Sequence, residues 1–297
     1  MQNTIENKIW TVLSLLQWTS EYLHAKGFDD ARLNGELMLA HILNCTRVDL
    51  YLHFDKPLSA QELSSFKILF KRRLSHEPLQ YVLGATEFMG LKFAVDRRVL
   101  IPRAETEVLV EEALKIIRGT GGGCSVLDVG TGSGCIAVSL ARHFPACVVT
   151  ATDSNEESLE VARANASSNG AAGMVRFIHH DIFHPVDDLP GKPYDAILSN
   201  PPYISESEKD SLAREILDFE PPVALLEGGD GLRFFRRIVG IGADLLKNGG
   251  WLCFEVGYDQ AEPVSRMFSV AGYGDLQTIK DYSGNDRVVR ARWGSGG

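Results

Sequence analysis

The spacing of apolar residues divides the chain into a helical region and a region where strands alternate with helices. Within residues 1–80, apolar side chains recur every three to four positions, as at Ile9 and Val12, which is the period of one helical face. Ser59 and Glu62 have the spacing of a capping box ahead of a further apolar run of the same period. We therefore predict a small, all-helical N-terminal domain over residues 1–80.

The apolar period then shortens to two. Leu91, Phe93 and Val95 alternate with less apolar or charged residues, a pattern that is typical of a strand. Met89-Gly90 ahead of this strand has the composition of a turn. We predict a β-hairpin over residues 81–100 that links two domains.

From Ser125 onward, short apolar runs alternate with helical periods, which indicates an α/β fold with a doubly wound, Rossmann-like parallel sheet. The expected strands are Ser125–Val129, Val148–Thr152, Val175–His179, Ala196–Ser199 and Trp251–Val256, with Arg287–Trp293 as a final strand, antiparallel at one side. The expected helices are Cys135–His143, Glu156–Asn169, Gly231–Leu246 and Glu262–Val270. This second domain covers residues 101–297.

Composition restricts the class of protein. The chain has 297 residues, 44% of them hydrophobic and 23% charged, which is ordinary for a globular protein. A net charge of −9 argues against a protein that holds nucleic acid through its phosphates. The five cysteines are odd in number and lack C-x-x-C spacing, so no zinc site or disulfide framework is indicated. With no signal peptide and no membrane-length apolar stretch, we expect a cytoplasmic protein without a membrane partner.

A glycine-rich segment follows the first strand of the predicted sheet. Gly130, Thr131, Gly132, Ser133 and Gly134 can turn sharply, approach a ligand closely and lead into a helix N-terminus with free N–H groups.

An acidic residue ends the next strand. Asp153 lies where a carboxylate accepts hydrogen bonds from the hydroxyls of a ribose. A dinucleotide fingerprint would need glycine at position 135, where the chain has Cys135. The pattern therefore favours a nucleoside carrying a sulfonium amino acid; the alternative is a tight turn without a ligand.

A polar and an apolar residue follow the third strand. Asp181 and the Ile182 backbone can recognise an adenine edge while the Ile182 side chain covers the ring, although a surface aspartate in a turn is the simpler interpretation.

After the fourth strand comes Asn200-Pro201-Pro202-Tyr203. The prolines have no N–H to continue a sheet, so carbonyl oxygens here lack ladder partners. Together with the Asn200 side-chain oxygen they can accept both hydrogens of a planar NH2 group; the alternative is a plain Pro-Pro loop.

With these residues at one sheet edge, the chain resembles class I S-adenosylmethionine-dependent methyltransferases. More closely, it resembles the HemK-type release-factor glutamine N5-methyltransferase family over nearly its whole length. The matching segments are Glu77–Tyr81, Ile101–Glu107, Asp128–Gly134, Asn200–Ile204, Glu220–Leu232, Glu255–Gly257 and Asp281–Val289. One departure is Ala104, where the family usually has a second proline.

The resemblance implies transfer of a methyl group from S-adenosyl-L-methionine to the glutamine amide in the Gly-Gly-Gln loop of peptide chain release factors. It implies that Asn200, Pro201, Pro202 and Tyr203 are catalytic. It also assigns the glycine loop, Asp153, Asp181, Ile182 and Asn200 to the cofactor, with no metal. Release factors are the expected partners, and a monomer and no direct nucleic-acid binding are expected. The alternatives are an adenine-amino methyltransferase acting on DNA or RNA, and a non-catalytic module that binds the cofactor.

Overall fold

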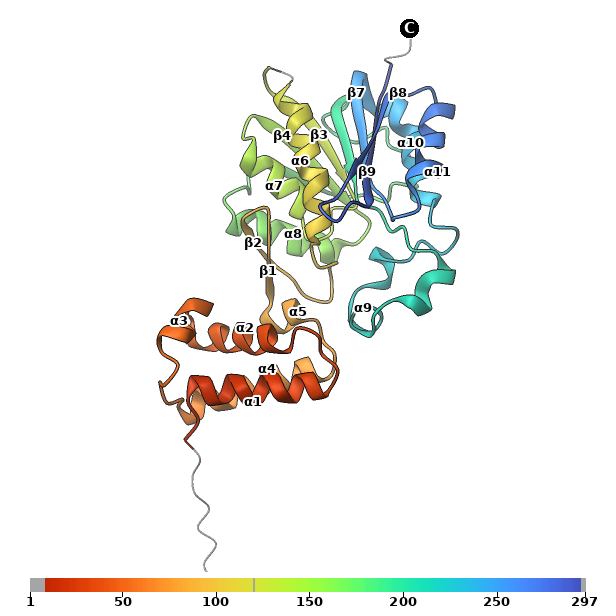
Figure 1. The fold of residues 1–297 in the computed structure, drawn as a ribbon. Helices are drawn as coiled ribbons and strands as arrows, with labels where there is room; N and C mark the ends of the chain where they lie inside the picture. The colour runs from red at the N-terminus through yellow and green to blue at the C-terminus, as the bar shows by residue number, and fades with distance from the viewer. Residues whose placement is uncertain (1–8, 120, 295–297) are drawn as a thin grey trace, which may run out of the picture. The chain divides into compact units, whose positions relative to one another are not determined.

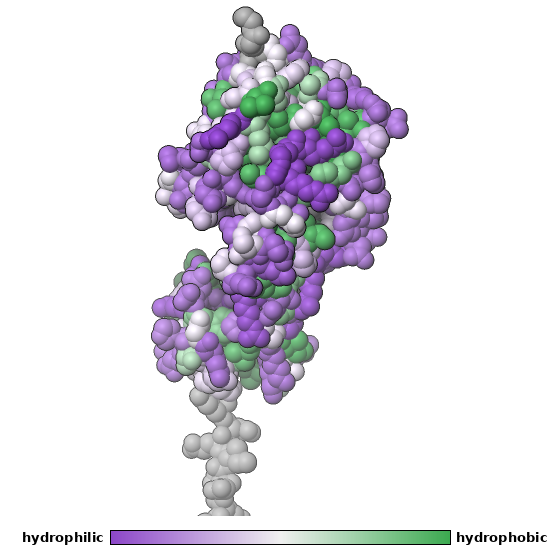
Figure 2. All heavy atoms as spheres, turned by 90° about the vertical axis from the view of Figure 1, so that its right-hand side faces the viewer, coloured by the Kyte–Doolittle hydropathy of each residue, from purple (hydrophilic) through white to green (hydrophobic). Residues whose placement is uncertain are grey.

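The computed structural model describes residues 9–119 and 121–294 (Figure 1). The chain forms two compact units, one ending at Leu83 and the other beginning at Gly84. No helix within the described ranges combines the length and the apolar character that crossing a membrane requires. On the face drawn in Figure 2, polar side chains predominate and apolar ones are scattered among them.

The first unit is helical. Its helices are α1 (Val12–Ala25), α2 (Ala31–Leu43), α3 (Arg47–Leu52), α4 (Ala60–Leu74) and α5 (Leu79–Leu83). The capping box of Ser59 and Glu62 is present at the start of α4. The first helix, however, begins only at Val12, because Thr11 caps it, and Ile9 lies outside it with 76% of its surface exposed.

The hairpin is shorter than the sequence indicated. Its strands are β1 (Ala85–Phe88) and β2 (Leu91–Ala94), which pair antiparallel around Met89 and Gly90. The expected start at residue 81 is wrong, since Tyr81 lies in helix α5. Phe88 and Phe93 are buried in the core of the second unit, so the hairpin packs as part of that unit.

The second unit contains a seven-stranded sheet in the order β5-β4-β3-β6-β7-β9-β8. Its strands are β3 (Cys124–Val129), β4 (Cys147–Asp153), β5 (Val175–His179), β6 (Tyr194–Ser199), β7 (Leu246–Glu255), β8 (Gly274–Lys280) and β9 (Asp286–Arg292). The first five in this order are parallel, and the β7–β9 and β9–β8 pairs are antiparallel. The predicted doubly wound fold is confirmed. The final strand is antiparallel as expected, but it lies inside the sheet, because β8 forms the edge.

Helices cover both faces of this sheet (Figure 1). They are α6 (Ala104–Arg118), α7 (Cys135–His143), α8 (Glu156–Ser168), α10 (Arg233–Leu245) and α11 (Ala261–Val270). Two separate apolar clusters result, one under α6 and α7 and the other under α10 and α11. Val126 belongs to the first cluster and Leu127 to the second, because successive side chains of a strand point to opposite faces.

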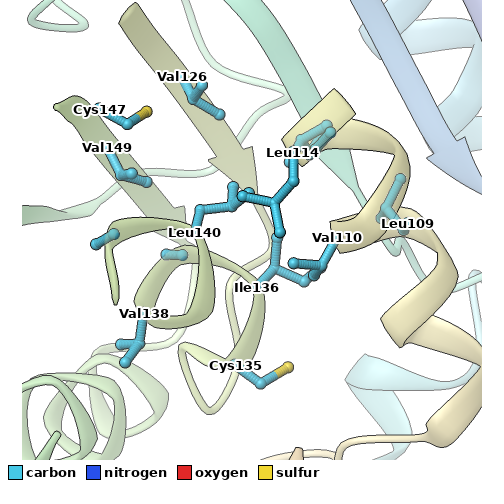
Figure 3. Packing of buried hydrophobic residues seen from close by; sticks show 14 of the residues in the cluster. Leu109, Val110, Leu114, Val126, Cys135, Ile136, Val138, Leu140, Cys147 and Val149 are labelled. Carbon is cyan, nitrogen blue, oxygen red and sulfur yellow. The ribbon is translucent and has the colours of Figure 1, made fainter. Parts of the chain in front are cut away.

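Packing on the first face fixes helix α6 relative to the strands. Figure 3 shows Val110 and Leu114 of α6 pointing toward Ile136 and Leu140 of α7, beside the strands. All four side chains are at most 5% exposed. This contact holds the N-terminus of α6 near the carboxyl edge of the sheet, where the candidate site lies.

The candidate active site

The sheet has its topological switch point between β3 and β6. From β3 the chain runs outward to β4 and β5, and then returns to place β6 on the other side of β3. Ligands of open α/β sheets bind outside the carboxyl ends of strands at such a point. A cavity at this edge is lined by eight residues predicted from the sequence: Gly130, Gly132, Asp153, Asp181, Ile182, Asn200, Pro201 and Pro202.

Four other predicted residues do not line this cavity. Thr131 and Ser133 are each 3% exposed and turn into the protein, and Gly134 is the N-cap of α7. Tyr203 lines a second cavity, described below. Thr131, Ser133 and Gly134 therefore shape the loop and do not line the cavity.

The glycine loop needs glycine for two different reasons. Gly130, Gly132 and Gly134 have φ values of 75°, 54° and 80°, in the left-handed region that favours glycine. At Gly134 a Cβ would also lie 3.0 Å from the Cβ of Ala162, so α7 and α8 approach too closely for a side chain.

Asp153 connects this loop to the end of β4. Its Oδ2 accepts a hydrogen bond from the Gly132 N–H at 2.8 Å, and its Oδ1 accepts one from the Asn155 N–H at 2.9 Å. Burial raises the pKa of Asp153, although these backbone donors oppose the shift. Because a carboxylate oxygen accepts more than one hydrogen bond, both remain able to bind hydroxyl groups of a ligand.

Asp128 is a buried acid beneath the glycine loop, and it was not among the predicted site residues. Its Oδ2 accepts a hydrogen bond from the Thr131 hydroxyl at 2.7 Å, while its Oδ1 has no partner among the described residues. Burial raises the pKa of Asp128 to about 7. The residue ties the loop to β3, at the cost of placing an ionisable group in an apolar environment.

Asp181 and Ile182 line the same cavity from the end of β5. Asp181 Oδ1 accepts a hydrogen bond from the Phe183 N–H at 2.9 Å, which fixes the turn. The Ile182 side chain is 5% exposed, and its carbonyl accepts a hydrogen bond from Arg237 Nε at 2.8 Å. This leaves an apolar wall beside a carboxylate, as the recognition of a purine requires.

Asn200 and Pro201 line both the first cavity and a second one, which also contains Arg103, Tyr203 and Glu255. Asn200 Nδ2 donates to the Thr106 hydroxyl at 3.2 Å, so the amide nitrogen has a partner within the protein. The Asn200 side-chain oxygen is then the atom that remains to accept a hydrogen bond from a ligand.

Gln260 holds the Asn-Pro-Pro-Tyr segment in place. Its Nε2 donates to the carbonyls of Tyr203 at 2.9 Å and Gly231 at 3.2 Å, and its Oε1 accepts from the Gly257 N–H at 3.0 Å. At Gly231 a Cβ would lie 2.6 Å from the Tyr203 carbonyl oxygen. Close backbone approach thus explains why glycine stands at position 231, in one of the segments that carry the family resemblance.

An ion pair with a buried carboxylate holds Arg103 at the second cavity. Arg103, in the Ile-Pro-Arg segment, binds the carboxylate of Glu220, which is 3% exposed. The other Glu220 oxygen accepts from the Ile101 N–H at 3.4 Å. This contact joins the segment before α6 to the loop after the Asn-Pro-Pro-Tyr motif, although 117 residues separate Arg103 from Glu220.

The residues at this edge fit S-adenosyl-L-methionine. The loop residues that line the cavity, Gly130 and Gly132, have no side chains, the Asp153 oxygens can accept further hydrogen bonds, and Ile182 supplies an apolar wall. A metal is not suggested: no group of three or more His, Cys, Asp or Glu side chains suited to a metal ion occurs in residues 9–119 and 121–294.

Comparison with known proteins agrees with this arrangement. The family model of the PrmC N-terminal domain matches residues 14–84, and that of the methyltransferase small domain matches residues 105–252. The chain is 44% identical over 291 residues to the release factor glutamine methyltransferase of Geobacter sulfurreducens, covering 98% of this chain and 100% of that protein. It is 40% identical to the protein of that name from Chlorobaculum tepidum, covering 95% and 97%.

A solved structure shares the fold. A methyltransferase from Pyrococcus furiosus superimposes with a TM-score of 0.50 at 20% identity, covering 78% of this chain and 98% of that one. At this identity the likeness concerns the fold alone.

Proposed function

The chain belongs to the release factor glutamine methyltransferase family, and we propose that it transfers a methyl group from S-adenosyl-L-methionine to the glutamine side-chain amide in the Gly-Gly-Gln loop of peptide chain release factors. The observation that carries this proposal is that Asn200 and Pro201 line both cavities. A group held by these two residues in the second cavity reaches the cavity that fits the cofactor.

The chemistry of an amide acceptor matches these residues. An amide nitrogen is a poor nucleophile because its lone pair is delocalised into the carbonyl group. When bound, the cofactor supplies a methyl group activated by a positively charged sulfonium. Asn200 Oδ1 and the Pro201 carbonyl accept the two N–H hydrogens, which fixes the direction in which the nitrogen faces. Catalysis then rests on positioning and on a matched electrostatic environment.

The second cavity suits a neutral side chain. Burial raises the pKa of Tyr203 to about 12, so its phenol stays uncharged and forms a wall for the glutamine. Between Ser199 and Tyr203 there is no carboxylate to bind an arginine and no base to deprotonate a lysine. Glu255 also lines this cavity, but burial raises the pKa of its carboxyl group to about 7, which disfavours the charged form. The acceptors fit an NH2 group, which glutamine offers.

We further propose that residues 1–80 recognise the release factor, that the protein acts as a monomer in the cytoplasm, and that it does not bind nucleic acid directly. The support for a recognition role is that every residue lining the two cavities belongs to the second unit. The helical unit is therefore available for contact with the substrate protein.

Incubation with radiolabelled S-adenosyl-L-methionine tests the proposal. Separate reactions contain a release factor, duplex DNA, or structured RNA, each with wild-type enzyme and with Asn200→Ala. Label should enter only the release factor, and only with the wild-type enzyme. Label in DNA or RNA would assign an adenine amino group as the acceptor. Cofactor binding without any transfer would indicate a non-catalytic module.

A further inference from the structure

The side chain of Asn200 works in only one of its two orientations. Its oxygen must face the acceptor cavity, because an NH2 group turned that way would meet the NH2 group of the substrate. The two orientations have nearly the same shape, so packing alone does not distinguish them, and hydrogen-bond partners decide. The partner of Asn200 is therefore part of the catalytic apparatus.

That partner is the hydroxyl of Thr106, at 3.2 Å from Asn200 Nδ2. Thr106 lies in the first turn of α6 and is 2% exposed. A hydroxyl is both a donor and an acceptor, so by itself it would tolerate either orientation of the amide. The Thr106 hydroxyl selects one orientation of the amide only if it donates its own proton to a different acceptor.

Glu255 is placed to meet this requirement. It ends β7, is 2% exposed and lies close enough to the Thr106 hydroxyl for that group to lower the pKa of its carboxyl group, against the larger upward effect of burial. In either protonation state its carboxyl group has an oxygen that accepts the Thr106 proton. The Thr106 oxygen is then left as an acceptor, which only the Asn200 nitrogen can satisfy. Glu255 also lines the acceptor cavity, and its Oε2 has no hydrogen-bond partner within the described part of the chain.

We propose that Thr106, with its proton held by Glu255, is a positioning residue that fixes the orientation of the Asn200 amide and so presents Oδ1 to the acceptor. This inference rests on the proposed function for its catalytic consequence, but the orientation itself can be measured independently. The order Glu255, Thr106, Asn200 brings together the ends of β7 and β6 and the first turn of α6.

The kinetic test compares Thr106→Val with Thr106→Ser in the full-length enzyme. Valine keeps the shape and removes the hydroxyl, whereas serine keeps the hydroxyl. We expect Thr106→Val to lower kcat on a release factor by about tenfold, the equivalent of one hydrogen bond. The KM for S-adenosyl-L-methionine should change less than kcat, because Thr106 itself does not line the cofactor cavity. Thr106→Ser should retain most of the activity. An unchanged kcat in Thr106→Val, or an equal loss in both variants, would overturn the proposal.

Side-chain amide resonances of Asn200 supply the second measurement, in a ¹H–¹⁵N spectrum of the cofactor-bound protein. They are assigned by their disappearance in Asn200→Asp. They should shift in Thr106→Val and stay near the wild-type position in Thr106→Ser; resonances that do not move in either variant would refute the orientation by Thr106. If the wild-type enzyme labels no release factor, the proposed function is wrong. The spectrum still shows whether Thr106 orients the Asn200 amide.

Discussion

At the scale of single residues, the site is built from polar atoms that each hold one partner inside the protein and keep capacity for a ligand. Asn200 gives its nitrogen to Thr106 and keeps its oxygen. Asp153 accepts one backbone N–H on each oxygen and keeps further lone pairs. Such internal partners fix the side chains before a ligand arrives, which lowers the entropy cost of binding.

Replacing Asp153 with alanine should weaken cofactor binding. The carboxylate offers charge-assisted hydrogen bonds from a largely buried position, so we expect a loss of about 1.5–3 kcal/mol in the free energy of binding. Calorimetric titration with S-adenosyl-L-methionine measures it, with the exposed Asp187→Ala as the matched control. Unchanged affinity in Asp153→Ala would remove Asp153 from the cofactor site.

Asp128→Asn should reduce the pH dependence of stability. The folded-state pKa of Asp128 is raised by burial from 3.8 to about 7. The folded state therefore binds the proton more tightly than the unfolded chain, and stability is lost as pH rises from about 4 through 7. Relative to wild type, removing the acid should make the free energy of unfolding larger at pH 8 than at pH 5, by at most about 3 kcal/mol, because the wild-type protein loses about 1.4 kcal/mol per pH unit between pH 5 and 7.

Urea denaturation at the two pH values measures this difference, and exposed Asp187→Asn controls for the change in net charge. Comparing the two pH values cancels the pH-independent cost of burying an amide. An equal effect of Asp128→Asn at pH 5 and pH 8 would show that Asp128 is not a buried acid with a raised pKa.

The sequence predicted those site residues that directly follow strands. Asp153 and Asn200 were found because the end of a parallel strand places its next residues at one edge. Gln260 had no such signal, since its partner Tyr203 lies 57 positions away and Gly231 lies 29 positions away. Thr106 lay within a segment that carried the resemblance, but its contact with Asn200 spans 94 positions and follows from tertiary packing alone.

At the scale of the elements, the start of α6 explains the departure at Ala104. Arg103 is the N-cap, with φ −101° and ψ 146°, and Ala104 is the first helical residue. Proline is favoured at that position, because its N–H would lack a helical partner and its φ suits a helix. The extended backbone of Arg103 also tolerates a following proline. Alanine at position 104 therefore keeps the start of α6 unchanged. It lacks only the restriction that proline would place on the backbone of the unfolded chain.

Ala104→Pro should consequently stabilise the protein, by about 0.4–1 kcal/mol, through the unfolded state. Lys115→Pro in the last turn of the same helix is the contrasting variant, and it should lower stability by up to about 3 kcal/mol, because proline has no N–H and clashes with the preceding turn. Chemical denaturation measures both. A loss of stability in Ala104→Pro would mean that α6 does not begin where the structure places it.

Elements with an apolar face were predictable, and those without one were not. The runs in β3 and β6 are buried on both faces and were found within two residues of their bounds. In contrast, β8 was missed because most of its residues are exposed, so no apolar alternation marks it. It forms by pairing with β9 at the sheet edge, and this pairing leaves no local signature.

At the scale of the whole molecule, chemistry and recognition are proposed to lie in different units. The helical unit has an apolar core of its own, and the residues around both cavities come from the other unit. A chain that begins at Gly84 should therefore bind S-adenosyl-L-methionine like the full-length protein. It should lose activity on an intact release factor while methylating a short Gly-Gly-Gln peptide at the full-length rate. Full activity on the intact release factor would refute a recognition role for the helical unit.

The proposed function requires that the methyl group is transferred to a glutamine amide held by Asn200 and Pro201. Mass spectrometry locates the methyl group on a release factor after reaction with the enzyme, alongside a release factor whose Gly-Gly-Gln glutamine is replaced by glutamate. We expect one added methyl group on the peptide that contains Gly-Gly-Gln, and none on the glutamate variant, which lacks the NH2 group. A methyl group on the glutamate variant, or on any other residue of the release factor, would refute the proposed function.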